Sequence, residues 1–153
     1  MCWRQSLKQG MNMAYTWSSD LETGNTKIDH QHEQLFAAVN ALWDAYRSGK
    51  GRQEVENTME FLLAYISKHF ADEEALQEKY GYPEYLAHKR LHTEFKSIAH
   101  RLVTELSQDG PTDKVIGDIY ATVGEWLVTH IQGDDFQMAA YVRNKEDEAQ
   151  KRT

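Results

Sequence analysis

The stretch HFADEEALQEKYGYPEYLAHKRLH, which runs from His69 to His92, decides the fold. It contains a turn signal, Gly81-Tyr82-Pro83. His69 and Glu73 precede this turn at a helical spacing of four, and His88 and His92 follow it at the same spacing. At about 1.5 Å of rise per helical residue, the first pair lies roughly 18 and 12 Å above the turn, and the second pair roughly 9 and 15 Å. Two antiparallel helices joined here would therefore bring all four side chains to one level.

Outside this stretch, apolar residues recur in steps of three and four, which is the spacing of one face of an α-helix. Breaks at 48–51, at 81–83 and at 110–111 separate four such segments. We expect helices from about Ile28 to Ser48, from about Arg52 to Tyr80, from near Pro83, and from near Thr112, a candidate N-cap. Short connections between long helices favour antiparallel neighbours, so the sequence predicts an all-α, up-down-up-down four-helix bundle.

The two ends of the chain lie outside this pattern. We expect residues 1–15 to form an N-terminal arm, residues 16–146 the bundle domain, and residues 147–153 a polar tail, with a short tail helix after Gly133. A length of 153 residues suits one domain with a sizeable core.

The apolar stripes have gaps, and residues that commonly bind metals fill them. His32 stands between Ile28 and Leu35 at helical spacing, and His130 follows Leu127 by three residues. Antiparallel packing brings six such side chains to the same end of the bundle: His32, His69, Glu73, His88, His92 and His130. Buried groups of this kind cost free energy unless each is paired. A metal centre removes that cost, and a hydrogen-bonded polar layer in the core is the alternative.

Five histidines and a carboxylate exceed the four ligands of a structural zinc site and suit a dinuclear centre. Mixed imidazole and carboxylate ligation favours iron. A second carboxylate is available after His130, because Asp134 follows it by four residues and Asp135 by five. Asp134 lies on the regular helical face, whereas Asp135 reaches inward only if the helix loosens, which Gly133 would ease. The spacing alone leaves this choice open.

These motifs resemble the hemerythrin family, especially its single-domain bacterial members, the bacteriohemerythrins. The matching residues are IDHQH at 28–32, HFADEE at 69–74, the pair His88 and His92, WLVTHI at 126–131, and Asp135. The likeness covers roughly residues 15–142. It implies a non-haem di-iron centre with an oxo or hydroxo bridge.

The resemblance also assigns the ligands. It implies that His88, His92 and His130 hold one iron, that His32 and His69 hold the other, and that Glu73 and Asp135 bridge both. It thereby selects Asp135 over Asp134. Family members have no ligand at the positions of His30 and His100, so we expect both at the surface.

The resemblance implies reversible dioxygen binding for storage, delivery or sensing, which favours a binding protein over an enzyme. The iron held by His32 and His69 has fewer protein ligands, so the open position is expected there. Leu127 and Ile131 flank His130 and, by resemblance, wall the oxygen pocket, an expectation compatible with plain core packing. A di-iron oxidase, a peroxidase or a nitric-oxide-handling enzyme with the same ligands is the alternative. A signalling module is a third interpretation, which requires an attached output domain.

Composition limits the partners. A net charge of −7 argues against a nucleic-acid or anionic-membrane surface, since both need clustered Lys and Arg. No apolar run approaches the roughly 20 residues of a membrane-spanning helix, and the first ten residues lack a signal-peptide pattern. Cys2 is the only cysteine, so we expect a cytoplasmic protein without an internal disulfide. Dioxygen is the expected ligand, an oxygen-consuming enzyme is a candidate recipient, and we expect a monomer or weak oligomer.

Overall fold

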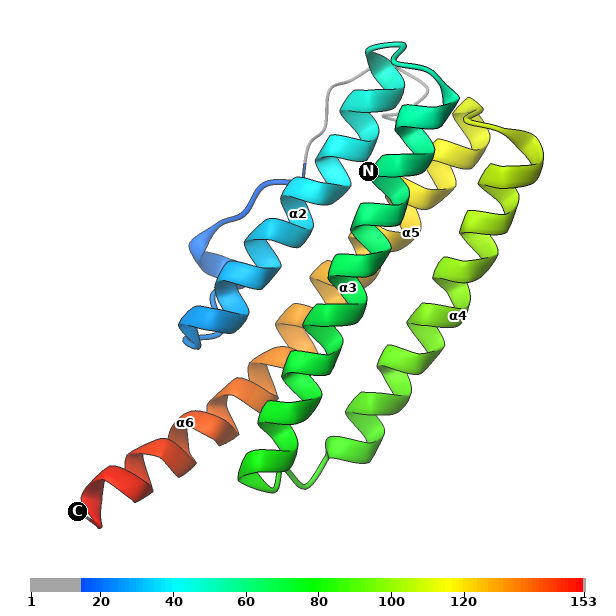
Figure 1. The fold of residues 1–153 in the computed structure, drawn as a ribbon. Helices are drawn as coiled ribbons and strands as arrows, with labels where there is room; N and C mark the ends of the chain where they lie inside the picture. The colour runs from blue at the N-terminus through cyan, green and yellow to red at the C-terminus, as the bar shows by residue number, and fades with distance from the viewer. Residues whose placement is uncertain (1–14, 153) are drawn as a thin grey trace.

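The computed structural model describes residues 15–152, so the expected arm falls almost wholly outside the described residues. Four long helices form the bundle: α2 (Thr26–Arg47), α3 (Arg52–Tyr80), α4 (Tyr85–Asp109) and α5 (Asp113–His130). Helices α2 and α4 each contact both α3 and α5, which closes the four into a ring (Figure 1). Between residues 15 and 152 there is no strand. The predicted four-helix bundle is confirmed.

Local signals account for the helix ends. The Asn25 side chain accepts a hydrogen bond from the backbone N–H of Ile28, and the Thr112 hydroxyl accepts one from Val115, so both residues are N-caps. Helix α3 ends at Tyr80 and is capped by Gly81, whose φ of 64° is a left-handed conformation that glycine adopts without strain. Helix α4 begins two residues later than expected, because Pro83 lies in the turn.

The core fills the space between the four helices and includes the predicted apolar stripes. The three- and four-residue steps of the second helix also predict Leu76 on its apolar stripe, and this expectation is wrong. Leu76 is only partly buried and packs on a small cluster at one end of the bundle, whereas the neighbouring Gln77 is fully buried. The reason is helical geometry: Gln77 lies four residues after Glu73, which lies four after His69, so all three share the face that points inward.

The segment before α2 packs against the bundle. The Tyr15 N–H donates to Asn40 Oδ1 and the Asn40 amide donates back to the Tyr15 carbonyl. Gly124 in α5 lies so close to the Tyr15 ring that an added Cβ would overlap it. Trp17 packs on Phe36 of α2, with ring centroids 5.9 Å apart. A short 3-10 helix, η1 (Ser19–Leu21), leads from here into α2.

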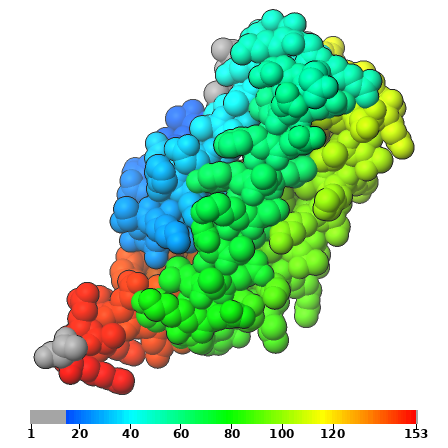
Figure 2. All heavy atoms as spheres, viewed as in Figure 1, coloured from blue at the N-terminus to red at the C-terminus, as the bar shows by residue number. Residues whose placement is uncertain are grey.

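Beyond α5 the chain continues through one turn of π-helix, η2 (Ile131–Asp135), into α6 (Phe136–Lys151). Helix α6 extends past the bundle and packs on the end of α3 (Figures 1 and 2). Met138 and Val142 of α6 form a small buried cluster with Tyr82. The helix runs through most of the expected polar tail. None of the helices in the described part of the chain has the length and apolar content needed to cross a membrane.

Candidate metal centre

All seven predicted ligands come together inside the bundle, near the end where α3 turns into α4. His32 comes from α2, His69 and Glu73 from α3, and His88 and His92 from α4, while His130 ends α5 and Asp135 ends η2. Each of the seven side chains is buried, and none is more than 4% exposed. Antiparallel packing therefore places the ligands at one level, as the heights above the turn predicted.

The π-helical turn decides which aspartate joins the cluster. In a regular α-helix a residue five positions after His130 points about 140° away from it. The wider turn of η2 removes most of that rotation, so Asp135 points inward and is fully buried. Asp134 stays partly exposed and lies 3.0 Å from the outer nitrogen of His130, Nδ1. The loosening of the helix that Asp135 required is confirmed.

The Glu73 carboxylate divides its two oxygens between two sets of histidines. Its Oε1 lies 3.3 Å from His32 Nε2 and 2.9 Å from His69 Nε2. Its Oε2 lies 3.2 Å from His88 Nε2 and 3.1 Å from His92 Nε2. One carboxylate thus faces both sets at once.

The Asp135 carboxylate, which comes from η2, also divides its two oxygens between the two sets of histidines. Its Oδ2 lies 2.9 Å from His32 Nε2, while its Oδ1 lies 3.1 Å from both His88 Nε2 and His130 Nε2. Ligand atoms therefore form two groups that share Glu73 and Asp135. The three-histidine group adds His88, His92 and His130, and the two-histidine group adds His32 and His69.

Several buried polar atoms in the cluster lack a hydrogen bond of acceptable geometry. They are His32 Nε2, Glu73 Oε1 and both oxygens of Asp135. Three imidazole Nε2 atoms also converge, with His130 Nε2 3.2 Å from the Nε2 atoms of both His92 and His88. Ligand atoms about 2.1 Å from one ion, at right angles, lie about 3 Å apart. The spacing and the unpaired atoms fit two adjacent metal ions, with imidazole nitrogens and carboxylate oxygens as ligands.

The imidazoles and carboxylates of the cluster change one another's pKa values. Burial lowers the pKa of His32, but the nearby carboxylates of Asp135 and Glu73 outweigh this effect and raise it to about 9. Burial also lowers the pKa of His88, and the same two carboxylates outweigh it and raise the pKa to about 9. Burial lowers the pKa of His92 despite Glu73. For Glu73, burial favours the neutral acid, yet His69 and the other facing imidazoles bring its pKa well below the usual range.

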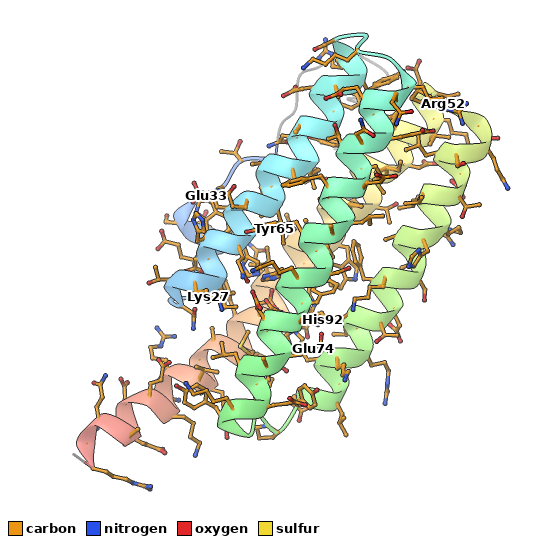
Figure 3. The ribbon with its side chains drawn as sticks, viewed as in Figure 1. Lys27, Glu33, Arg52, Tyr65, Glu74 and His92 are labelled. Carbon is orange, nitrogen blue, oxygen red and sulfur yellow. The ribbon has the colours of Figure 1, made fainter. Side chains whose placement is uncertain are left out.

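Three polar side chains outside the cluster contact the outer nitrogens of the ligands. Gln31 Oε1 lies 2.7 Å from His69 Nδ1, Glu74 Oε2 lies 3.3 Å from His92 Nδ1, and Asp134 Oδ2 contacts His130 Nδ1. Figure 3 shows Glu74 of α3 and His92 of α4 side by side. Such contacts orient a metal-binding imidazole and select its tautomer. His32 Nδ1 is buried and has no such partner among residues 15–152.

Aromatic rings enclose the ligands. Phe70 stacks on His92 with centroids 3.8 Å apart, and Trp126 stacks on His130 at 4.3 Å. Trp17 lies against His32 at 6.3 Å. Leu127 and Ile131, the expected walls of the oxygen pocket, are both buried in the main core.

The remaining two histidines are where the sequence predicted. His30 and His100 are both exposed and belong to neither group of ligand atoms. Sequence reasoning did not name Gln31, Glu74, Asp134 or Trp17 as neighbours of the ligands. A usable signal existed for three of them, since Gln31, Glu74 and Asp134 are polar residues within four positions of a predicted ligand.

Comparison with known proteins agrees with this geometry. Residues 23–142 match the family model described as the hemerythrin HHE cation binding domain. The chain is 35% identical over 133 residues to a bacteriohemerythrin of Pseudomonas paraeruginosa, which covers 86% of this chain and 84% of that protein. It is 28% identical over 123 residues to a myohemerythrin of Theromyzon tessulatum, covering 80% and 89%.

The fold agrees as well. A crystal structure of wild-type hemerythrin superimposes with a TM-score of 0.73 at 26% identity, covering 85% of this chain and 98% of that one. The family model matches well over half of the chain, and the bacteriohemerythrin is similar across most of its length. The chain belongs to the hemerythrin family.

Proposed function

We propose that the chain holds two iron ions between its four helices and binds dioxygen reversibly at them, for storage, delivery or sensing. The observation that carries this proposal is the division of each carboxylate between the two histidine groups. Glu73 and Asp135 each direct one oxygen to either group, which is the arrangement that two bridged metal ions require. A single ion would leave half of these ligand atoms unused.

The two positions differ in the number of ligands that the protein supplies. The three-histidine group offers His88, His92 and His130 with the two carboxylates, and the two-histidine group offers one nitrogen fewer. The position at His32 and His69 therefore has room for an external ligand. Iron bound in this mixed nitrogen and oxygen set supplies electrons that dioxygen needs to bind and takes them back when it leaves.

The residues around the ligands keep water and other reactants away. Phe70, Trp126 and Trp17 cover three imidazoles, and the buried side chains of Leu127 and Ile131 flank His130 in the sequence. An apolar enclosure disfavours charged intermediates that would otherwise escape as reduced oxygen.

Anaerobic reconstitution with ferrous iron tests the proposal. The protein should take up close to two irons per chain, gain an absorption band in the visible range on adding oxygen, and lose it under vacuum. Seven ligands and two groups predict this stoichiometry. One zinc per chain, with no uptake of iron, would overturn it.

The same experiment separates binding from turnover. A binding protein returns to its starting spectrum in repeated cycles without consuming an added reductant. An oxidase, a peroxidase or a nitric-oxide-handling enzyme would consume reductant continuously. Sustained consumption by the reconstituted protein would replace reversible binding with the enzymatic alternative while leaving the metal centre in place.

A further inference from the structure

Gln31 links the ligand His69 to a charged pair on the protein surface. It lies in α2 next to His32, yet its side chain crosses to α3 and is buried. Its Oε1 lies 2.7 Å from His69 Nδ1, and its Nε2 lies 2.6 Å from Asp72 Oδ2. Both ends of one buried amide are therefore used, and both bonds join α2 to α3.

Hydrogen-bonding capacity fixes the direction of this link. Asp72 forms an ion pair with the Lys68 ammonium 2.9 Å away, so its carboxylate is ionised and can only accept. The NH₂ end of Gln31 must then face Asp72, and its carbonyl end must face His69. Since a carbonyl also only accepts, His69 donates through a proton on Nδ1, which leaves Nε2 as the nitrogen that faces Glu73 and a bound metal.

Two lysines hold Asp72, the residue at the surface end of this link. Asp72 Oδ2 accepts from Lys68 one turn earlier in α3. The ammonium of Lys27, which Figure 3 labels at the start of α2, lies 3.9 Å from the same oxygen. Asp72 is about a quarter exposed and the two lysines are well exposed. The charges thus stay at the solvent boundary, and only a neutral amide reaches the ligand.

The other outer partners differ in charge. The two that serve the three-histidine group are acidic side chains, with Glu74 at His92 and Asp134 at His130. The two-histidine group has the neutral Gln31 at His69, and no partner at His32 Nδ1 among the described residues. A carboxylate partner makes an imidazole a stronger donor and stabilises the more highly charged state of the metal. A neutral amide orients the ring without that effect.

We propose that Gln31 is a positioning residue that orients His69 through its Nδ1, and that its neutral amide makes the two-histidine group the weaker donor set. The metal at His32 and His69 is then the harder of the two to oxidise. This inference rests on the proposed metal centre, and it predicts that the charge of one outer side chain sets the rate at which the oxygen-binding form is oxidised.

Three variants separate orientation from charge. Gln31→Leu removes both hydrogen bonds at similar volume. Gln31→Glu combined with Asp72→Asn keeps both bonds, because the Asn amide donates to the new carboxylate, and it moves the negative charge next to His69. Glu74→Gln is the matched control, since it removes a charge from the partner of His92 in the other group.

The first readout needs no metal. In the metal-free protein, the chemical shifts of His69 should show a hydrogen-bonded proton on Nδ1, and Gln31→Leu should shift that proton to the position of one without an acceptor. The second readout is metal binding, where Gln31→Leu should weaken the affinity of one of two sites by about 10- to 100-fold and the double variant should restore it. An unchanged shift of the Nδ1 proton together with unchanged affinity would overturn the positioning role.

The third readout is the rate at which the iron-loaded protein oxidises in air. The double variant should oxidise faster than the wild type, and Glu74→Gln should not. Equal rates in the wild type and the double variant would overturn the role of charge. If the wild type itself takes up no iron, the proposed function fails, while the shift of the His69 Nδ1 proton still decides whether Gln31 positions the ring.

Discussion

Replacing Leu127 by alanine tests whether the apolar layer beside the ligands protects the centre. Leu127 lies one helical turn before His130, is 2% exposed and belongs to the main core. The change removes three buried carbons at roughly 0.8 kcal/mol each, about 2.4 kcal/mol in total. The cavity left behind raises the loss in the free energy of unfolding to about 2–5 kcal/mol. Because this cavity would lie one helical turn from the ligand His130, we expect the variant to change the oxidation rate as well as the stability.

We expect the Leu127→Ala protein to keep its iron and to oxidise faster in air, because water gains access to the space beside His130. The assay is the decay of the oxygen-bound absorption band in air-saturated buffer, with iron content and helical circular dichroism measured on the same sample. The wild type sets the reference rate.

Leu106→Ala is the matched control. Leu106 is also 2% exposed and buried in the same core, but it lies in α4 about 21 Å further along the bundle than His92. It should lose a similar free energy of unfolding with no change in the oxidation rate. An unchanged rate in folded, iron-loaded Leu127→Ala, or an equal increase in both variants, would show that Leu127 does not protect the centre.

Three further predictions concern the ligands, the packed N-terminal segment and the metal-free state. Asp135→Ala removes an oxygen from both histidine groups, so iron uptake should fall at both positions, as metal analysis would show; retention of two irons would refute a bridging role. Gly124→Ala should displace the Tyr15 ring and lower the free energy of unfolding by about 1–3 kcal/mol, measured by denaturant titration, and a loss undiminished when Tyr15→Ala is added would contradict this contact. In the metal-free protein, the pKa values of His32 and His88 lie near 9, above their ordinary value of 6.5. Their stabilisation is complete below about pH 6.5 and is lost as the pH rises through 9, so the melting temperature should fall across this range, and a flat profile would be inconsistent with the raised pKa values. The metal-loaded protein should lack this fall, because bound metal already holds its imidazoles neutral.

The sequence by itself determined the bundle and most of the cluster. The helix predicted from about Arg52 to Tyr80 ends where expected, and Thr112 is the N-cap that its hydroxyl suggested. The six polar residues in the apolar stripes are buried at one level. These features follow from the sequence because helical periodicity and turn residues are local, and antiparallel connection by short turns converts positions along each helix into heights in the bundle.

The sequence narrowed the inward-facing carboxylate to two neighbouring aspartates, and the tertiary structure decided between them. Spacing left Asp134 and Asp135 as alternatives, since a regular helix favours the first and a loosened one the second. The π-helical turn brings Asp135 inward and leaves Asp134 to contact the outer nitrogen of His130. A π-helical turn has poorer local geometry than an α-helical one, so the favourable contacts of Asp135 in the cluster, rather than its local sequence, select it.

Only the tertiary structure decided which atoms face each other across helices. Neither the division of Glu73 between the two groups nor the bond from Gln31 to His69 can be read from spacing. The sequence pattern also did not predict that Gln77 is buried in place of Leu76, or that Trp17 packs against His32. Periodicity specifies the apolar face of each helix to within one residue, or about 100° of rotation. The final rotation and axial shift depend on how the side chains of all four helices pack together.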